Sequence, residues 1–165
     1  MEPQFSINSK EALLEKLKRS FSRRAGYGQY QVDWVFDVAV TAWHMADWVA
    51  HNGGVDVKDM QERVKKACPE LAVCEKVCNG AKHLVLSNPK LKGFDVTADV
   101  KGTGDLRGIS SNFSVGAETA VDIVSTPVVS IKGDNGTSWD AIDVFHKVIR
   151  FWQSELGLPV DGVGS

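Results

Sequence analysis

The sequence predicts an α+β protein: an antiparallel bundle of about five helices with a small antiparallel β-sheet inserted before the last helix. Apolar residues recur at helical spacing through residues 8–84 and again through residues 140–156. Between these segments, residues 93–139 are rich in Val, Thr, Ser, Ile and Gly, which favours strands and turns. The links between the helices are short, and short links favour antiparallel neighbours.

The length of 165 residues predicts a single domain, residues 1–165. About 45 residues cannot easily bury a core alone, so the β insertion is expected to pack beside the bundle. The hydrophobic content of 43% and the charged content of 24% are ordinary for a globular domain and exclude a disordered tail or a fibre. The net charge of −2 gives no overall basic surface of the kind that attracts nucleic acids.

Capping residues and chain breakers place the first three helices. Asn8 and Glu11 resemble a capping box at the start of the first helix, which is expected to end near Arg24. A second helix is expected from about residue 33 to residue 51, before an Asn-Gly-Gly breaker. Asp56 can cap a third helix that ends near residue 67.

The remaining elements follow from similar signals. Pro69 suits the first turn of a fourth helix that runs to about residue 84. Residues 94–100 alternate with period two, as expected of a half-buried strand, and residues 128–132 form a second strand pattern. Asp140 is expected to open the last helix, which runs to about residue 156. Shorter strand patterns lie at residues 112–115 and 120–125, and a turn pattern lies at residues 133–136.

The cysteines and the start of the chain predict a cytoplasmic protein with no membrane partner. Three cysteines, an odd number in one short stretch, fit reduced thiols better than a disulfide framework (Cys68, Cys74 and Cys78). The first residues show no charged-then-apolar signal pattern. The most apolar segment, residues 34–50, contains two aspartates and a histidine, and it is too short to span a bilayer.

The second helix carries an unusual row of short ionisable side chains. At about 100° per residue, they fall within a stripe roughly 80° wide (Asp33, Asp37, His44, Asp47 and His51). An exposed helix face usually carries Lys, Glu and Arg, yet residues 25–57 contain none of them. We therefore expect a central helix, partly buried all round, whose polar groups meet partners from neighbouring helices.

Three interpretations of this row remain open. It forms a structural hydrogen-bond network, or it lines a functional cleft together with the fourth helix, or three of its members ligate a metal. The metal ligands would be His44, Asp47 and His51, which suit a divalent metal such as Zn, Fe or Mn. The spacing matches no established ligand motif, and no other cofactor is indicated.

The fourth helix ends in a polar group at helical spacing. Asn79 lies three residues before Lys82 and four before His83, so the three side chains share a face. Cys74 and Cys78 lie one turn apart in the same helix and are interpreted as small core residues.

The Asn-Gly-Ala-Lys-His end of this helix, after a long helix with acidic residues, resembles the HEPN group of small helical domains, several of which are ribonucleases. The resemblance implies an RNA- or nucleotide-binding module in which His83 is the base or phosphate contact, positioned by Asn79, Lys82 and Asp47. Active members carry an Arg four to six residues before the His, beside the polar residue. Cys78 stands at that position here, and Cys cannot make the bidentate phosphate contact of Arg. This departure predicts a degenerate ribonuclease.

The layout is also similar to uncharacterised bacterial or phage proteins with Trp-His-x-x-Asp-Trp and Asn-x-x-Lys-His segments, which implies no function.

Two other classes of function remain as alternatives. One is a non-catalytic protein-interaction module that docks a partner, such as a second copy in a homodimer, on the sheet or the Trp-rich bundle. Five tryptophans could serve as anchors, though most are expected in the core (Trp34, Trp43, Trp48, Trp139 and Trp152). The other is a metal-binding helical-bundle protein.

The densest basic run is interpreted as a solvated helix face (Lys16, Lys18, Arg19, Arg23 and Arg24).

Overall fold

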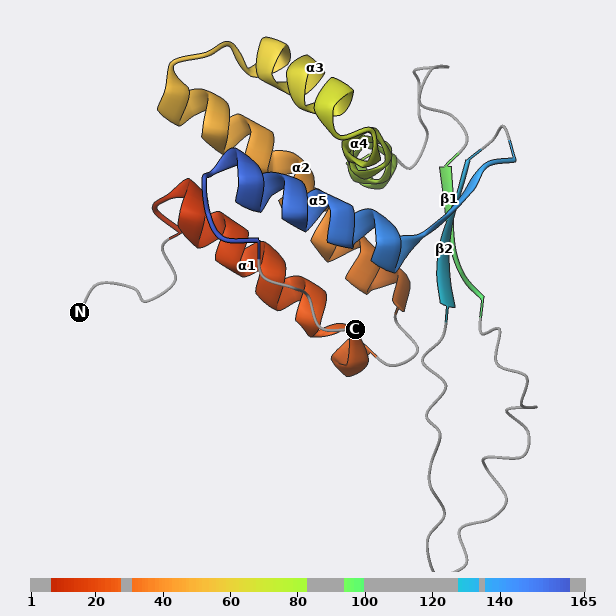
Figure 1. Ribbon diagram of the computed structural model, residues 1–165. Coiled ribbons are helices and arrows are strands. Elements are labelled where there is room, and N and C mark those ends of the chain that lie inside the picture. The colour runs from red at the N-terminus through yellow and green to blue at the C-terminus, as the bar shows by residue number, and fades with distance from the viewer. Residues whose placement is uncertain (1–6, 28–30, 83–93, 100–127, 134–135, 161–165) are drawn as a thin grey trace, which may run out of the picture.

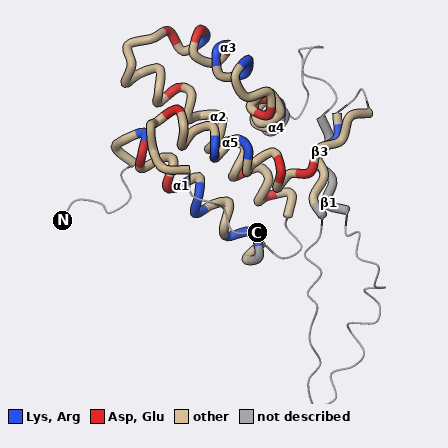
Figure 2. The backbone as a smooth tube through the Cα atoms, in the orientation of Figure 1, with Lys and Arg blue, Asp and Glu red and all other residues tan. Residues whose placement is uncertain are grey.

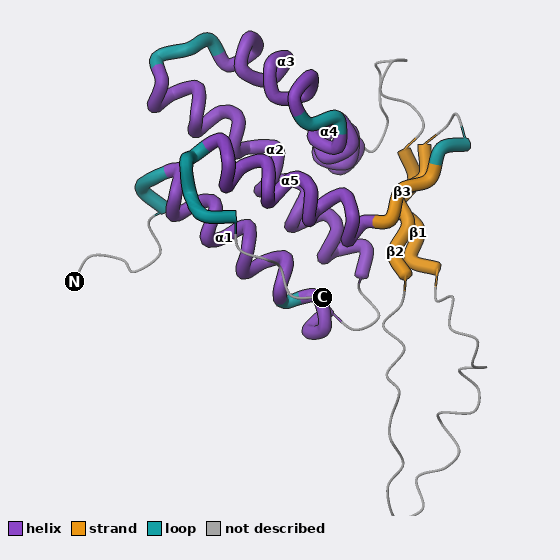
Figure 3. The backbone as a smooth tube through the Cα atoms, viewed as in Figure 1, coloured by secondary structure: helices purple, strands orange, loops and turns teal. Residues whose placement is uncertain are grey.

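In the computed structural model, the described residues are 7–27, 31–82, 94–99, 128–133 and 136–160. They form five α-helices, a short 3-10 helix and a three-stranded antiparallel sheet (Figure 1). The sheet lies at one end of the bundle and precedes the last helix in the chain (Figure 3). The predicted fold class is therefore confirmed.

The first two helices are α1 (Lys10–Ser22) and α2 (Gln31–Gly53), with a 3-10 turn, η1 (Arg24–Tyr27), between them. The predicted cap of α1 is wrong by one residue. Ser9 has extended backbone, and its side chain accepts a hydrogen bond from the backbone N–H of Ala12 at 3.1 Å. Asn8 therefore lies outside the helix.

The next two helices are α3 (Val57–Ala67) and α4 (Glu70–Lys82). The Asp56 carboxylate caps α3 as predicted, because it accepts from the backbone N–H groups of Lys58 at 2.9 Å and Asp59 at 3.2 Å. Pro69 lies directly before α4, and its carbonyl accepts from the backbone N–H of Ala72 in the first turn at 3.0 Å. The predicted end of this helix near residue 84 lies outside the described residues.

The sheet consists of β1 (Phe94–Asp99), β2 (Val128–Gly133) and β3 (Ser138–Asp140), paired in that order. The first two strands match the predicted patterns. The third is three residues long, and sequence patterning did not indicate it. Ile131 of β2 pairs with Trp139 and is fully buried, so the inner face of the sheet closes one end of the core. The weaker patterns at 112–115 and 120–125 lie outside the described residues.

The last helix, α5 (Ala141–Glu155), starts directly after β3. Asp140 ends the strand and also caps the helix, since its carboxylate accepts from the backbone N–H of Ile142 at 2.8 Å. Thus α5 crosses the bundle beside α2 (Figure 1).

The centre of the bundle is α2, which contacts the other four α-helices and β1. Two indole groups help to hold it there. Trp152 of α5 is fully buried, and its Nε1–H donates to the Ala42 carbonyl at 3.1 Å. Trp34 is fully buried, and its Nε1–H donates to the Ser20 carbonyl at 3.1 Å. Trp43 is also buried, so the expectation that most tryptophans lie in the core is confirmed.

Trp152→Ala is expected to destabilise the fold by about 3–5 kcal/mol, because it removes a fully buried indole together with its hydrogen bond to the Ala42 carbonyl. Urea unfolding followed by circular dichroism measures this loss. The matched control is Arg150→Ala, an exposed position in the same helix, which is expected to change the free energy of unfolding by no more than about 0.5 kcal/mol. Equal effects of the two substitutions would contradict this assignment of the core.

Candidate functional site

The predicted stripe of α2 lies on one face of the helix, and we call its members, together with Val40, the α2 outer row. The row is spaced by three or four residues throughout (Asp33, Asp37, Val40, His44, Asp47 and His51). Asp33, Asp37 and His51 are exposed, and the other members are half-buried. The expectation that α2 is partly buried all round is therefore wrong at these three positions. The apolar arc of α2 faces the other helices, and the outer row lies at the surface between them, with half of its members exposed.

The adjoining helix α1 runs antiparallel to α2 and presents cations beside the outer row. Lys16, Arg19 and Arg23 lie at helical spacing on its exposed side. Figure 2 shows Lys and Arg positions in blue along α1, whereas α2 contains no Lys or Arg. Negative and positive side chains thus form parallel rows on two neighbouring helices.

A shallow groove of about 370 Å³ lies between the two rows. It is lined by Lys16, Ser20 and Arg23 from α1, and by Asp37, Val40 and Thr41 from α2. The Lys16 ammonium donates to Thr41 Oγ1 at 3.1 Å, and the Thr41 hydroxyl donates to the Asp37 carbonyl at 2.9 Å. The groove therefore gathers two cations, two hydroxyls and one carboxylate. The spacing of Lys16, Ser20 and Arg23 in the sequence indicates that they share one face of α1. It does not indicate that α2 lies beside that face.

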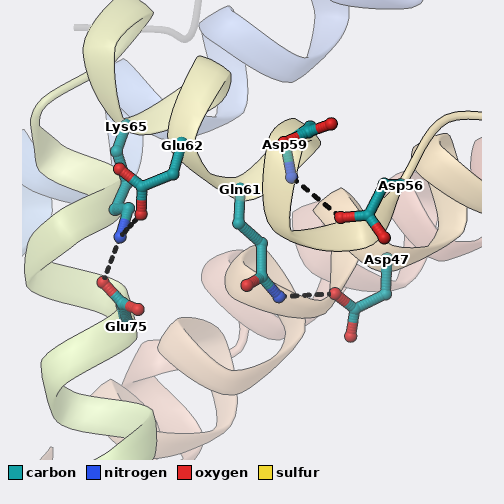
Figure 4. Close-up of polar contacts among 7 residues, drawn as sticks. All are labelled: Asp47, Asp56, Asp59, Gln61, Glu62, Lys65 and Glu75. Carbon is teal, nitrogen blue, oxygen red and sulfur yellow. Dashed lines mark hydrogen bonds and ion pairs between the residues drawn. The ribbon is translucent and has the colours of Figure 1, made fainter.

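One member of the outer row is held by a neighbouring helix. Gln61 Nε2 of α3 donates to Asp47 Oδ1 at 2.9 Å, as Figure 4 shows. Within the part of the chain that the structure describes, the polar partner of Asp47 thus comes from α3 rather than from α4. This contact supports the structural interpretation of the stripe at this position.

The junction of α3 and α4 is held by Lys65. Its ammonium pairs with Glu62 at 2.8 Å and with Glu75 at 3.1 Å (Figure 4), and it lies 5.8 Å from the centroid of the Trp43 ring. Burial alone would lower the pKa of Lys65, but the hydrogen bonds to the two carboxylates raise it above its ordinary value. Lys65 therefore stays charged and links α2, α3 and α4.

The three proposed metal ligands do not form a metal-binding group. Among the residues that the structure describes, no three His, Cys, Asp or Glu side chains lie close enough together to hold a metal. His44, Asp47 and His51 belong to this part of the chain. They share a helix face, but His44 and His51 are seven residues apart, which separates them by about 10 Å along the helix axis.

The residues of the HEPN-like motif are only partly described. Asn79 lies on α4 and is half-buried. Lys82 is the last residue of that helix, and its side chain lies outside the described part. His83 also lies outside it, so the geometry joining His83 to Asn79 and Asp47 stays a prediction.

Cys74 and Cys78 are core residues, as predicted, and Cys68 is buried as well. None of the three is in a disulfide. Burial and the nearby Glu70 carboxylate raise the pKa of Cys68 to about 11, and burial raises the pKa of Cys74 as well. Both are thiols rather than thiolates near neutral pH and lack the charge of a nucleophile.

Comparison with known proteins identifies no relative of this chain, so any function has to be inferred from the residues described above. No family model matches the chain, and no curated protein and no solved structure matches it either. In the described ranges, no helix combines the length and the apolar character needed to cross a membrane.

Proposed function

We propose that the chain is a non-catalytic protein-interaction module that docks its partner on the α2 outer row and the adjoining cations of α1. The observation that carries this proposal is the composition of the row. Lys, Glu and Arg would favour the helix at these exposed positions, and α2 uses none of them. A surface built from Asp, His and Val loses less side-chain entropy when a partner immobilises it.

Aromatic side chains on α2 support the same function. Phe36 and Trp48 are half-buried and pack on the core while keeping some exposed surface. Aromatic residues are enriched at protein interfaces, and Lys and Glu are depleted there. The carboxylates of Asp33 and Asp37 are complementary to basic side chains on a partner, so we expect the partner to present Lys or Arg there.

Photo-crosslinking inside the producing cell tests this proposal. A benzophenone side chain placed at His44 is expected to give a covalent adduct with one defined protein, identified by mass spectrometry. The control places it at Arg150, an exposed position on α5, where no such adduct is expected. Equal labelling from the two positions would contradict the proposed docking face. An RNA adduct from position 44 would contradict it too and would favour RNA binding, the second candidate function described below.

A second candidate function, favoured by the groove between α1 and α2, is binding of a nucleotide or an RNA phosphate. Lys16 and Arg23 can hold a phosphate, and Ser20 can donate to it. The volume of about 370 Å³ is within the range of small-molecule sites. In this function the HEPN-like residues Asn79 and His83 would supply a second phosphate contact.

If this candidate is correct, Arg23→Ala weakens binding of a nucleoside monophosphate by about tenfold, since it removes a charge-assisted hydrogen bond. Isothermal titration calorimetry measures the affinity. His83→Ala is expected to abolish any cleavage of single-stranded RNA, because a His near neutral pKa supplies the acid–base step. Wild-type protein that neither binds the nucleotide nor cleaves RNA above background would exclude this candidate.

A further inference from the structure

We infer that the partner is a second copy of this chain, bound face to face about a twofold axis parallel to α1 and α2. This inference rests on the proposed function, since it names the occupant of the same docking face. Its basis is charge complementarity within one surface. Arg23, the C-cap of α1, lines the same groove as Asp37 of α2. Arg19 lies one turn before Arg23 on α1, and Asp33 lies one turn before Asp37 on α2. All four side chains are exposed.

Contacts between α1 and α2 show which turn of α1 lies at the same height along the helix axes as which turn of α2. Lys16 of α1 bonds to Thr41 of α2, and the Trp34 indole bonds to the Ser20 carbonyl. The helices are antiparallel, so one turn along α1 from Lys16 corresponds to one turn back along α2 from Thr41. This step reaches Arg19 on α1 and Asp37 on α2. A further turn on each helix reaches Arg23 and Asp33.

A twofold axis along the groove places α1 of each copy over α2 of the other. Because the axis is parallel to the helices, the rotation does not change the height of any residue along them. Arg19 of one copy then faces Asp37 of the other, and Arg23 faces Asp33. Symmetry forms each pair twice. A twofold axis across the helices would instead lay α1 on α1 and α2 on α2, which opposes like charges. Electrostatics therefore selects the first arrangement.

The surface is large enough for such a dimer. The 23 residues of α2 span about 35 Å, the 13 residues of α1 span about 20 Å, and each helix is about 10 Å wide. The face thus offers roughly 550 Å² on each copy, or about 1,100 Å² in a dimer, just above the roughly 1,000 Å² expected of a specific interface. Val40 lies near its middle and supplies apolar contact between the charged pairs.

Reciprocal charge reversal tests the inference. One variant carries Arg19→Asp and Arg23→Asp, and the other carries Asp33→Arg and Asp37→Arg. Sedimentation equilibrium is expected to show a wild-type dimer and a dissociation constant raised at least about tenfold in each variant, because like charges then meet across the interface. Arg150→Asp on α5 is the matched control and is expected to leave the dimer unchanged. Circular dichroism confirms that every variant is folded.

Mixing the two variants is the decisive step. In the mixed pair, each reversed row meets the unlike row of its partner, so all the charge pairs re-form and a heterodimer is expected. Variants that dimerise like the wild type, or folded variants that do not pair when mixed, would overturn the inference. A wild-type monomer whose position 44 cross-links to a different protein would also overturn it and leave the proposed function standing. A monomer with no adduct from position 44 would overturn both.

Discussion

The wide apolar arc of α2 is the constraint on which the rest of the structure depends. Its residues need burial over more of the circumference than one neighbour can cover. Four helices and a strand therefore contact it, and two indole groups fasten it to α1 and α5. Because every neighbour packs on the same helix, the position of each depends on where α2 is apolar.

The outer row of α2 is the least covered strip of this helix, and its composition differs from that of the other exposed helix surfaces. The strip uses short polar side chains, and α1 places its cations along one edge. By contrast, α3 and α4 carry long charged side chains that pair with each other, such as Lys65 with Glu75. Long side chains on those helices are consistent with a solvated surface, and short ones on α2 with a surface that a partner covers.

The local signals in the sequence predicted much of the fold. Asp56 and Asp140 could be read as caps because a cap acts on backbone groups two or three residues away. At α1, two adjacent cap-forming residues were present, and only the backbone conformation of Ser9 decided between them. The short strand β3 could not be predicted, because three residues show no alternation and the strand forms by pairing with β2.

The candidate site was harder to predict because it depends on contacts between distant residues. The α2 row was evident from its spacing, but its exposure depends on where the other helices lie. The partner of Asp47 is Gln61, fourteen residues away on another helix, and nothing in the local pattern marks that pair. The groove likewise required Lys16 and Thr41, twenty-five residues apart, to meet.

The central claim is that a second copy covers the α2 outer row. Hydroxyl-radical footprinting at low and high protein concentration tests it most directly. The account predicts that oxidation of His44 and Trp48 falls as the concentration rises, while oxidation of Phe151, a half-buried residue on α5, stays constant. Oxidation of His44 and Trp48 that is independent of concentration, in a protein that is monomeric throughout, would contradict it.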